Sequence, residues 1–119
     1  MDKTRFNRWL EGYLKAWTSN DPEDIAALFT PEAKYTTQAF REPWDGRETI
    51  IASWLERDDQ PGTWTFEHQW LAVEGDSGVL EGLTVYIERR ESYANIWLIR
   101  LDAEGKCVVF KEWWVKEDG

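Results

Sequence analysis

Three polar side chains interrupt stretches of the sequence that are otherwise apolar, and their types suit acid–base chemistry. Glu112 and Asn95 stand within two runs of β-branched and aromatic residues near the C-terminus. A carboxylate among aromatic rings loses solvation, which raises its pKa and suits it to general acid–base catalysis. His68, the one histidine, lies between Phe66 and Trp70 in an alternating pattern, and imidazole titrates near neutrality. We therefore predict catalytic roles for Glu112 and His68, and a ligand-orienting role for Asn95.

Each of these residues also has a structural interpretation. Glu112 could form an ion pair or a hydrogen bond at the end of a pocket, with Arg100 as one partner, because buried charge is rarely left unpaired. A lone histidine on an apolar face is more often a hydrogen-bonded core residue. Asn95 could satisfy backbone groups at a bulge. The residue types therefore leave catalysis and structure as open alternatives.

The sequence offers no set of residues for a metal or a phosphate-bearing cofactor. One His and one Cys cannot make a zinc site, and the acidic residues lack the spacing of a calcium loop. There is no Gly-rich phosphate-binding loop. Cys107 lies in a strand-like pattern, which is typical of a small core residue rather than a nucleophile. We expect no cofactor.

The composition predicts one globular domain over residues 1–119, which is too short a chain for two. Nine Trp, five Phe and four Tyr exceed what a core of this size requires, and such rings often line a cavity or an interface. The net charge of −9 argues against nucleic acid or an anionic membrane as partner. No run approaches membrane-spanning length, and the N-terminus lacks the apolar region of a signal peptide, so we expect a cytoplasmic location.

The spacing of apolar residues predicts three helices in the first half of the chain. A stripe at i, i+3, i+4 and i+7 predicts a helix over residues 3–18. Asp21, followed by Pro, caps a short second helix, which stops before Pro31. Asp45 begins a third helix, with Glu three positions on as in a capping box. A short strand over 33–37 separates the second and third helices.

The period changes to that of strands in the second half of the chain. Alternation over 63–72 predicts a strand with one aromatic face, and a further strand follows over 79–88. Residues 93–116 read as a hairpin whose strands are apolar on both faces. Helices followed by an antiparallel meander predict an α+β fold, with helices on one side of a curved sheet.

These elements carry residues that resemble the nuclear transport factor 2-like superfamily. The resemblance lies in residues 28–35, in Phe40 and in the Gly-Arg-Glu-Thr-Ile segment at 46–50. Residues 100–106 and 112–114 resemble the closing hairpin of the SnoaL-like and ketosteroid-isomerase branch. The resemblance implies a cystatin-like cone, in which three N-terminal helices pack on a bent, mostly antiparallel sheet around a deep apolar pocket. It also implies a homodimer.

An ungapped match to the isomerase implies where its catalytic groups would fall. Tyr13 takes the place of the oxyanion-binding tyrosine, and we predict it as a catalytic hydrogen-bond donor, although helix packing explains it equally well. Thr37 stands where the isomerase has its carboxylate base, and Trp97 stands where it has its protonated acid. Trp114 matches a pocket tryptophan. Two of the three catalytic groups are therefore replaced, which argues against ketosteroid isomerase chemistry.

Strand parity extends this match to a predicted pocket wall. A four-residue loop over Ala103–Lys106 would pair Trp97 with Glu112 and Asn95 with Trp114. If both tryptophans face the pocket, residues of the same parity face it too. The predicted ligand-binding residues are Trp17, Tyr35, Trp54, Trp70, Tyr93, Asn95, Trp97, Phe110 and Trp114.

The predicted function is that of a small-molecule pocket protein, with an isomerase, dehydratase or cyclase using acid–base chemistry as the leading candidate. The expected ligand is a small hydrophobic or aromatic molecule with one or two oxygens. The alternative is a non-catalytic dimeric module that senses a ligand or binds a protein. The outer face of the last hairpin supports dimerisation, because an apolar sheet face left open to water invites a partner. That face would carry Ile96, Leu98, Val109, Lys111 and Trp113.

Overall fold

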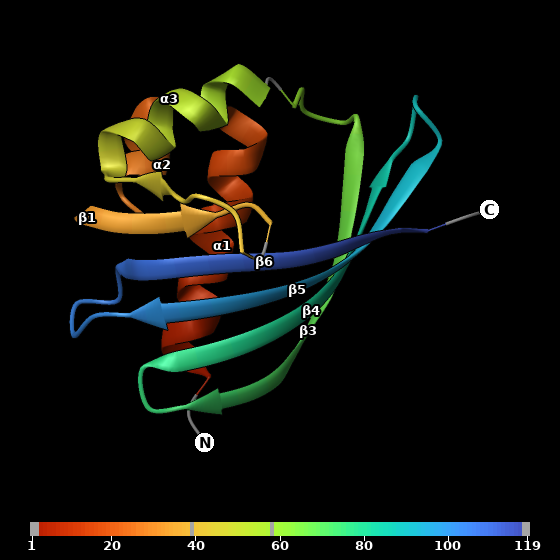
Figure 1. Ribbon diagram of the computed structural model, residues 1–119. Helices are drawn as coiled ribbons and strands as arrows, with labels where there is room; N and C mark the ends of the chain where they lie inside the picture. The colour runs from red at the N-terminus through yellow and green to blue at the C-terminus, as the bar shows by residue number, and fades with distance from the viewer. Residues whose placement is uncertain (1–2, 39, 58, 118–119) are drawn as a thin grey trace.

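The computed structural model describes residues 3–38, 40–57 and 59–117, and it shows helices packed against one curved six-stranded sheet (Figure 1). The strand order is β2-β1-β6-β5-β4-β3, and every neighbouring pair is antiparallel except β1 and β6, which run parallel. In chain order the elements are α1 (Thr4–Ser19), α2 (Pro22–Ala26), β1 (Phe29–Thr36), β2 (Trp44–Asp45), α3 (Arg47–Arg57), β3 (Trp64–Glu74), β4 (Ser77–Tyr86), β5 (Glu91–Leu101) and β6 (Cys107–Glu117). The predicted α+β class and the mostly antiparallel bent sheet are confirmed.

The first two helices form where the sequence predicts them. The apolar stripe of α1 is buried against the sheet, and the Asp21 side chain caps α2 by accepting a hydrogen bond from the backbone N–H of Glu23 at 2.8 Å. The second helix is shorter than predicted, because Phe29 already begins β1. Parallel pairing with β6 extends that strand, and the Cys107 N–H donates to the Leu28 carbonyl at 2.7 Å.

The predicted start of the third helix at Asp45 is wrong. Trp44 and Asp45 instead pair with Tyr35 and Lys34 as the short strand β2. Gly46 then turns the chain at φ +92°, a conformation that favours glycine, and α3 begins at Arg47. The turn from β2 into α3 fixes where this helix ends, and its last residue reaches the candidate site described below.

Two glycines of β4 let aromatic rings lie directly on the sheet. A Cβ on Gly82 would sit 2.4 Å from the Phe66 ring, and one on Gly78 would sit 2.8 Å from the Phe6 ring. Neither distance leaves room for a side chain. These positions therefore need glycine for close approach, and they let Phe66 stack on Trp97 with ring centroids 4.9 Å apart.

The closing hairpin has the predicted strand pairing, but not the predicted four-residue loop. The connection spans residues 102–106, one residue more than predicted, and a register shift between Arg100 and Leu101 restores the alignment. Trp97 pairs with Glu112 and Asn95 pairs with Trp114, so all four side chains project from one face of the sheet. The Asp102 carboxylate closes the loop by accepting hydrogen bonds from the N–H groups of Glu104 and Lys106, both at 2.9 Å. The turn chemistry thus holds the strand alignment on which the site depends.

The interior divides into two parts along α1, which crosses behind the sheet (Figure 1). One part, which we call the closed end, is packed with apolar side chains. Its residues, all at most 3 % exposed, are Phe6, Leu10, Leu80, Ile99 and Leu101. The other part, which we call the open end, begins at Tyr13, about two turns of α1 beyond Phe6. It contains the cavity of the candidate site. Cys107 is fully buried, as expected of a core residue. Among the described residues, no helix is long and apolar enough to span a membrane.

Candidate functional site

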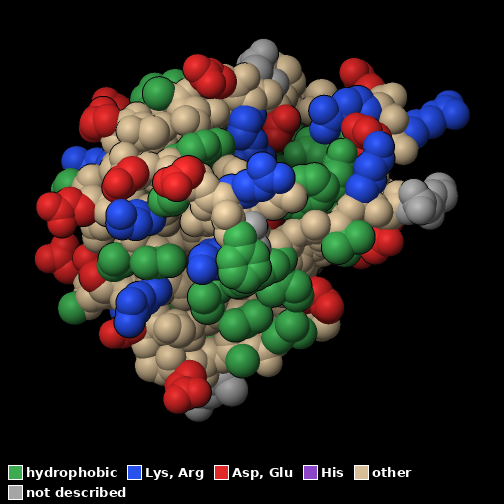
Figure 2. Space-filling model, in the orientation of Figure 1, with side chains coloured by type: hydrophobic (Ala, Val, Ile, Leu, Met, Phe, Trp, Pro, Cys, Tyr) green, Lys and Arg blue, Asp and Glu red, His purple; other side chains and the backbone are tan. Residues whose placement is uncertain are grey.

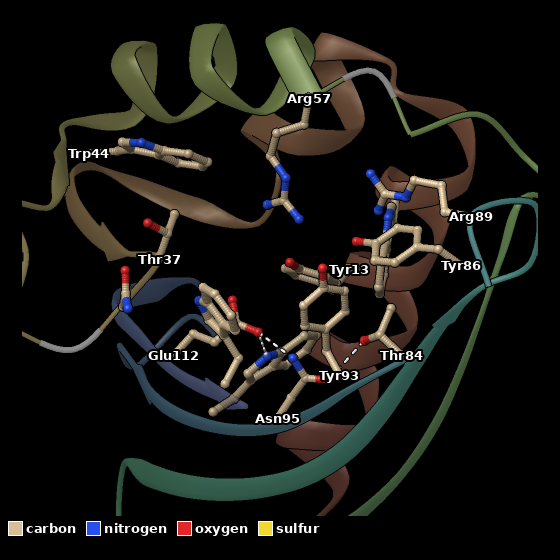
Figure 3. A pocket seen from close by; sticks show the side chains of 14 residues that line it. Tyr13, Thr37, Trp44, Arg57, Thr84, Tyr86, Arg89, Tyr93, Asn95 and Glu112 are labelled. Carbon is tan, nitrogen blue, oxygen red and sulfur yellow. Dashed lines mark hydrogen bonds between the residues drawn. The ribbon is translucent and has the colours of Figure 1, made fainter. Parts of the chain in front are cut away.

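A cavity of about 390 Å³ opens between the C-terminal half of α1, the end of α3 and the concave face of β4, β5 and β6 (Figure 3). Aromatic rings form most of its wall, and two arginines, one carboxylate and several hydroxyl and amide groups interrupt them. We call it the main cavity. Its lining residues are Tyr13, Trp17, Thr37, Gln38, Trp44, Arg57, Thr84, Tyr86, Arg89, Tyr93, Asn95, Trp97, Glu112 and Trp114.

Glu112 is held on the floor of the main cavity by a hydrogen-bond network. Its Oε2 accepts a hydrogen bond from Asn95 Nδ2 at 2.6 Å and another from Trp97 Nε1 at 3.1 Å (Figure 3). Asn95 Oδ1 in turn accepts a hydrogen bond from the Thr84 hydroxyl at 2.8 Å. The network fixes the orientation of Asn95, because each end of its amide has a defined partner.

The environment of Glu112 favours its neutral form. Removal from water raises the pKa of the carboxyl, and the hydrogen bonds from Trp97 and Asn95 together with the charge of Arg57 only partly offset that rise. A raised pKa keeps a carboxyl group protonated to higher pH than usual, which suits it to general acid–base catalysis. Of the two interpretations of Glu112, the hydrogen-bonded arrangement is present, and it leaves acid–base chemistry open.

Tyr13, on the cavity wall, forms a buried pair with Tyr35, which lies behind that wall. Their hydroxyl oxygens are 2.7 Å apart, and both rings are at most 3 % exposed. Burial is the main cause that raises the pKa of Tyr13 well above its usual value, and burial likewise raises that of Tyr35 to about 12. Both phenols therefore stay protonated at neutral pH. Tyr13 lines the main cavity, so it can offer a hydrogen bond to a ligand oxygen.

Arg57, the last residue of α3, places a permanent cation in the roof of the main cavity (Figure 3). Burial alone would lower its pKa, but the surrounding oxygens of Tyr35, Tyr13, Tyr86 and Glu112 outweigh burial and raise the pKa above the usual value. Arg57 is not among the site residues predicted from the sequence. A basic residue in the last turn of a helix is expected from the helix dipole alone, so its type carried no functional signal.

The structure brings together most, but not all, of the predicted site residues. Those that line the main cavity are Tyr13, Trp17, Tyr93, Asn95, Trp97, Glu112 and Trp114. Tyr35, Trp54 and Phe110 lie one layer behind, where each stacks or packs on a lining ring. Thr37 and Trp97, the positions where the isomerase would have carboxylates, both face the cavity.

His68 and Trp70 do not reach the main cavity, which corrects their predicted placement. Both have the predicted strand parity, but β3 is the edge of a curved sheet, so its middle lies away from the cavity. His68 is exposed and stacks on Phe66, whose other neighbour is Trp97, so the Phe66 ring lies between His68 and the cavity. Trp70 packs edge-on against Phe6 at the closed end, and its Nε1 donates to Asn7 Oδ1 at 2.8 Å.

The lining residues that the sequence analysis missed are mostly polar residues at the ends of elements. Thr84 lies in β4, whose inner face alternates small and apolar side chains, and Tyr86 and Arg89 lie where β4 ends. The one available signal was the hydroxyl at Thr84, which interrupts the buried parity of that strand. Trp44 and Gln38 belong to the segment between β1 and α3, which has no clear period in the sequence.

The opposite face of the sheet carries apolar side chains at the surface. Hydrophobic side chains gather over β4, β5 and β6 (Figure 2). Trp113 is 40 % exposed and Val115 is 65 % exposed, and Leu71 on β3 is 50 % exposed. Glu81, whose face the sequence left open, lies on this outer face and accepts a hydrogen bond from Gln69 at 3.0 Å.

The fold and the lined cavity define an α+β protein of the nuclear transport factor 2-like superfamily. The chain belongs to the SnoaL-like domain family, whose model matches residues 10–110. Members of this family include isomerases, cyclases and epoxide hydrolases. No curated protein matches the sequence significantly.

Solved structures confirm the fold at low sequence identity. A nuclear transport factor 2-like protein of unknown function from Burkholderia xenovorans superposes with a TM-score of 0.78 at 15% identity, covering 98% of this chain and 88% of that one. A steroid delta-isomerase from Pseudomonas aeruginosa gives 0.66 at 20% identity, covering 93% and 80%. SalBIII, an epoxide hydrolase/cyclase-like enzyme of pyran ring formation in salinomycin, gives 0.73 at 18% identity, covering 96% and 93%.

Proposed function

We propose that this protein binds an aromatic or apolar oxygen-bearing small molecule in the main cavity and acts on it by acid–base chemistry at Glu112. The observation that carries this proposal is the Glu112 carboxyl, which stands on an aromatic wall with its pKa raised and its orientation fixed by two hydrogen bonds. The carboxyl faces a cavity of about 390 Å³, and a group with a raised pKa in such a cavity is a candidate for acid–base chemistry.

The surrounding groups support a reaction in which a proton moves next to a carbonyl or ether oxygen. Tyr13 can donate a hydrogen bond to that oxygen, while Glu112 removes or returns a proton on the same molecule. The rings of Trp17, Trp97 and Trp114 would hold the flat part of the ligand. This division of roles is the usual one for isomerisation, dehydration and ring closure, and SalBIII and the steroid delta-isomerase share the fold.

A thermal-shift screen tests the binding part of this proposal. Flat ketones, phenols and polyketide-like compounds are tested against the wild-type protein, and a ligand present at one hundred times its Kd should stabilise the fold by about 2.7 kcal/mol. Every positive compound is then incubated with the protein and analysed for isomerised, dehydrated or cyclised product. The proposal fails if no compound of these classes shifts the melting temperature.

Glu112→Gln tests the chemical part, because the amide oxygen can still accept the hydrogen bonds from Asn95 and Trp97. Turnover should fall by about a hundredfold or more, the usual contribution of a positioned acid or base, while ligand affinity changes little. His68→Ala is the matched control, because His68 lies outside the main cavity. Unchanged turnover in the Glu112 variant would rule out its catalytic role.

A second function has one specific observation in its favour. Thr37 and Trp97 face the cavity where a ketosteroid isomerase would have carboxylates, so the protein lacks that enzyme's pair of acids. A non-catalytic dimeric module that senses a ligand fits this loss equally well. In that case compounds from the screen would bind without any product, and the outer face, including Trp113, would contact a second copy of the chain.

A further inference from the structure

The roof of the main cavity differs from its floor, because it carries positive charge that the proposed acid–base chemistry does not use. Figure 3 shows the Arg57 guanidinium reaching down from the end of α3 towards Tyr13, across the cavity from Glu112. Arg89 lies at the rim, with its guanidinium 4.0 Å from the centre of the Tyr86 ring. An aromatic cavity that also contains two guanidinium groups can bind a ligand that carries negative charge as well as an aromatic ring system.

The carboxylate that forms an ion pair with Arg57 does not line the main cavity, whereas Glu112, the other acidic group that acts on Arg57, stands across the cavity from it. The ion-pair partner is Asp59, at a long N–O distance of 3.9 Å, and Asp59 faces a small neighbouring cavity instead of the main one. The same Asp59 oxygen also accepts a hydrogen bond from Trp17 Nε1 at 3.1 Å and lies 3.5 Å from the Tyr86 hydroxyl. One carboxylate shared among three donors leaves much of the Arg57 charge available on the cavity side.

The phenols and the Trp44 ring near Arg57 cannot neutralise it. Tyr35 and Tyr86 interact with the guanidinium through hydroxyl oxygens, which carry no charge while their raised pKa values keep them protonated. The Trp44 ring centre lies 6.0 Å from the guanidinium carbon, at the outer limit of a cation–π contact. Arg89, by contrast, has a direct counter-ion in Glu91 at 3.2 Å and is largely exposed, so it is the weaker cation of the two.

We propose that the natural ligand of the main cavity is an aromatic carboxylate whose carboxylate group binds Arg57, with Arg89 assisting at the rim. This inference rests on the proposed binding function and names the class of its ligand. A guanidinium matches a carboxylate through two parallel N–H···O bonds, whereas a neutral carbonyl uses only one of them. The aromatic walls of Trp17, Trp97 and Trp114 hold the ring system, and the anion points towards α3.

The charge of the whole chain makes this arrangement selective. With a net charge of −9, the protein repels anions at long range. An anion therefore binds only where local positive charge outweighs the negative potential of the whole protein. Arg57 provides that charge in a partly desolvated place, where a charge-assisted hydrogen bond is stronger than at the surface. Glu112 stands at the opposite wall, so the reacting part of the ligand lies away from its carboxylate.

The test compares molecules that share one ring system and differ in charge. Naphthoate, naphthamide and acetonaphthone are titrated into the wild-type protein and into Arg57→Gln by isothermal calorimetry. Arg100→Gln serves as the matched control, because it makes the same charge change at an exposed position outside the cavity. Melting temperatures of all three proteins show whether each variant is folded.

The wild type and Arg100→Gln should each bind naphthoate at least about tenfold more tightly than naphthamide. Arg57→Gln should lose this preference for naphthoate but still bind naphthamide. Equal affinities for the three probes in the wild type would overturn the carboxylate assignment and leave the proposed function standing. Failure of all three probes to bind would overturn the carboxylate assignment alone if other compounds of the thermal-shift screen bind. If no compound of that screen binds either, the proposed function is overturned as well. The comparison within the wild type decides the matter even if Arg57→Gln does not fold.

Discussion

The two ends of the β5–β6 hairpin show how one pair of strands supplies both a core and a site. At the closed end, Ile99 and Leu101 are at most 1 % exposed and pack among apolar side chains. Further along the same face of β5, Trp97 and Asn95 carry N–H groups that converge on Glu112. The strand parity is identical at both ends, so only the residue types differ. The closed end therefore provides stability, and it allows the open end to keep polar groups that a core would not tolerate.

The largest expected effect is at the closed end. Ile99→Ala removes a fully buried side chain, and such deletions typically cost about 2–5 kcal/mol in the free energy of unfolding. Urea denaturation followed by tryptophan fluorescence measures this loss. Ligand affinity of the molecules that remain folded should stay unchanged. A loss below about 1 kcal/mol would show that the closed end is not the stabilising half.

A second variant lies between the two ends and should affect both. In Gly82→Ala the new Cβ would stand 2.4 Å from the Phe66 ring, so that ring must move. Overpacking of this kind usually costs about 1–3 kcal/mol, and Phe66 stacks on Trp97 of the cavity wall. We therefore expect lower stability in urea together with weaker ligand binding. Gly105→Ala, in the loop of the closing hairpin, is the control: its Cβ would contact nothing within 4 Å, so backbone strain at φ +84° is its only cost.

At the open end, Glu112 should make stability depend on pH. Because the folded-state pKa is raised above the ordinary value of 4.5, the native state holds the proton more tightly than the unfolded chain. The stabilisation of the fold that comes from this tighter proton binding is therefore fully present below pH 4.5. It is lost as the pH rises through the folded-state pKa of Glu112. Glu112→Gln cannot titrate, so it should gain stability relative to the wild type as the pH increases. Denaturation curves of both proteins at several pH values measure the difference, and a difference that stays flat would contradict it.

The smallest effects on stability are expected from two neighbouring tryptophans. Trp113 and Trp114 are both 40 % exposed, but they lie on opposite faces of β6. Trp114→Ala should weaken ligand binding without altering the molecular mass in solution. Trp113→Ala should leave ligand binding intact and shift a dimer towards monomer in analytical ultracentrifugation. If the wild type is already monomeric at micromolar concentration, the outer face has no role in self-association.

The sequence predicts the fold and the floor of the site better than it predicts the roof. Asn95, Trp97 and Glu112 could be placed together because side chains of paired strands alternate between two faces. The predicted loop was one residue too short, and a register shift next to it, which the sequence does not signal, keeps the pairing. His68 has the same strand parity but lies on the edge strand of a curved sheet. The alternation of residues along a strand does not predict how the sheet curves. Arg57 reaches the cavity only because α3 begins after the turn at Gly46 and ends above α1. Such tertiary placement has no local sequence signal.

Titration of the Glu112 carboxyl carbon by NMR shows directly whether Glu112 is an acid–base group in a ligand cavity. Glutamate-labelled protein is titrated alone and with a compound that binds in the thermal-shift screen, and Glu112→Gln assigns the signal. We expect a Glu112 pKa above the ordinary glutamate value in the free protein, because burial disfavours the charged form, and a further change in that pKa when the ligand binds. An ordinary pKa that does not respond to any bound compound would contradict this expectation.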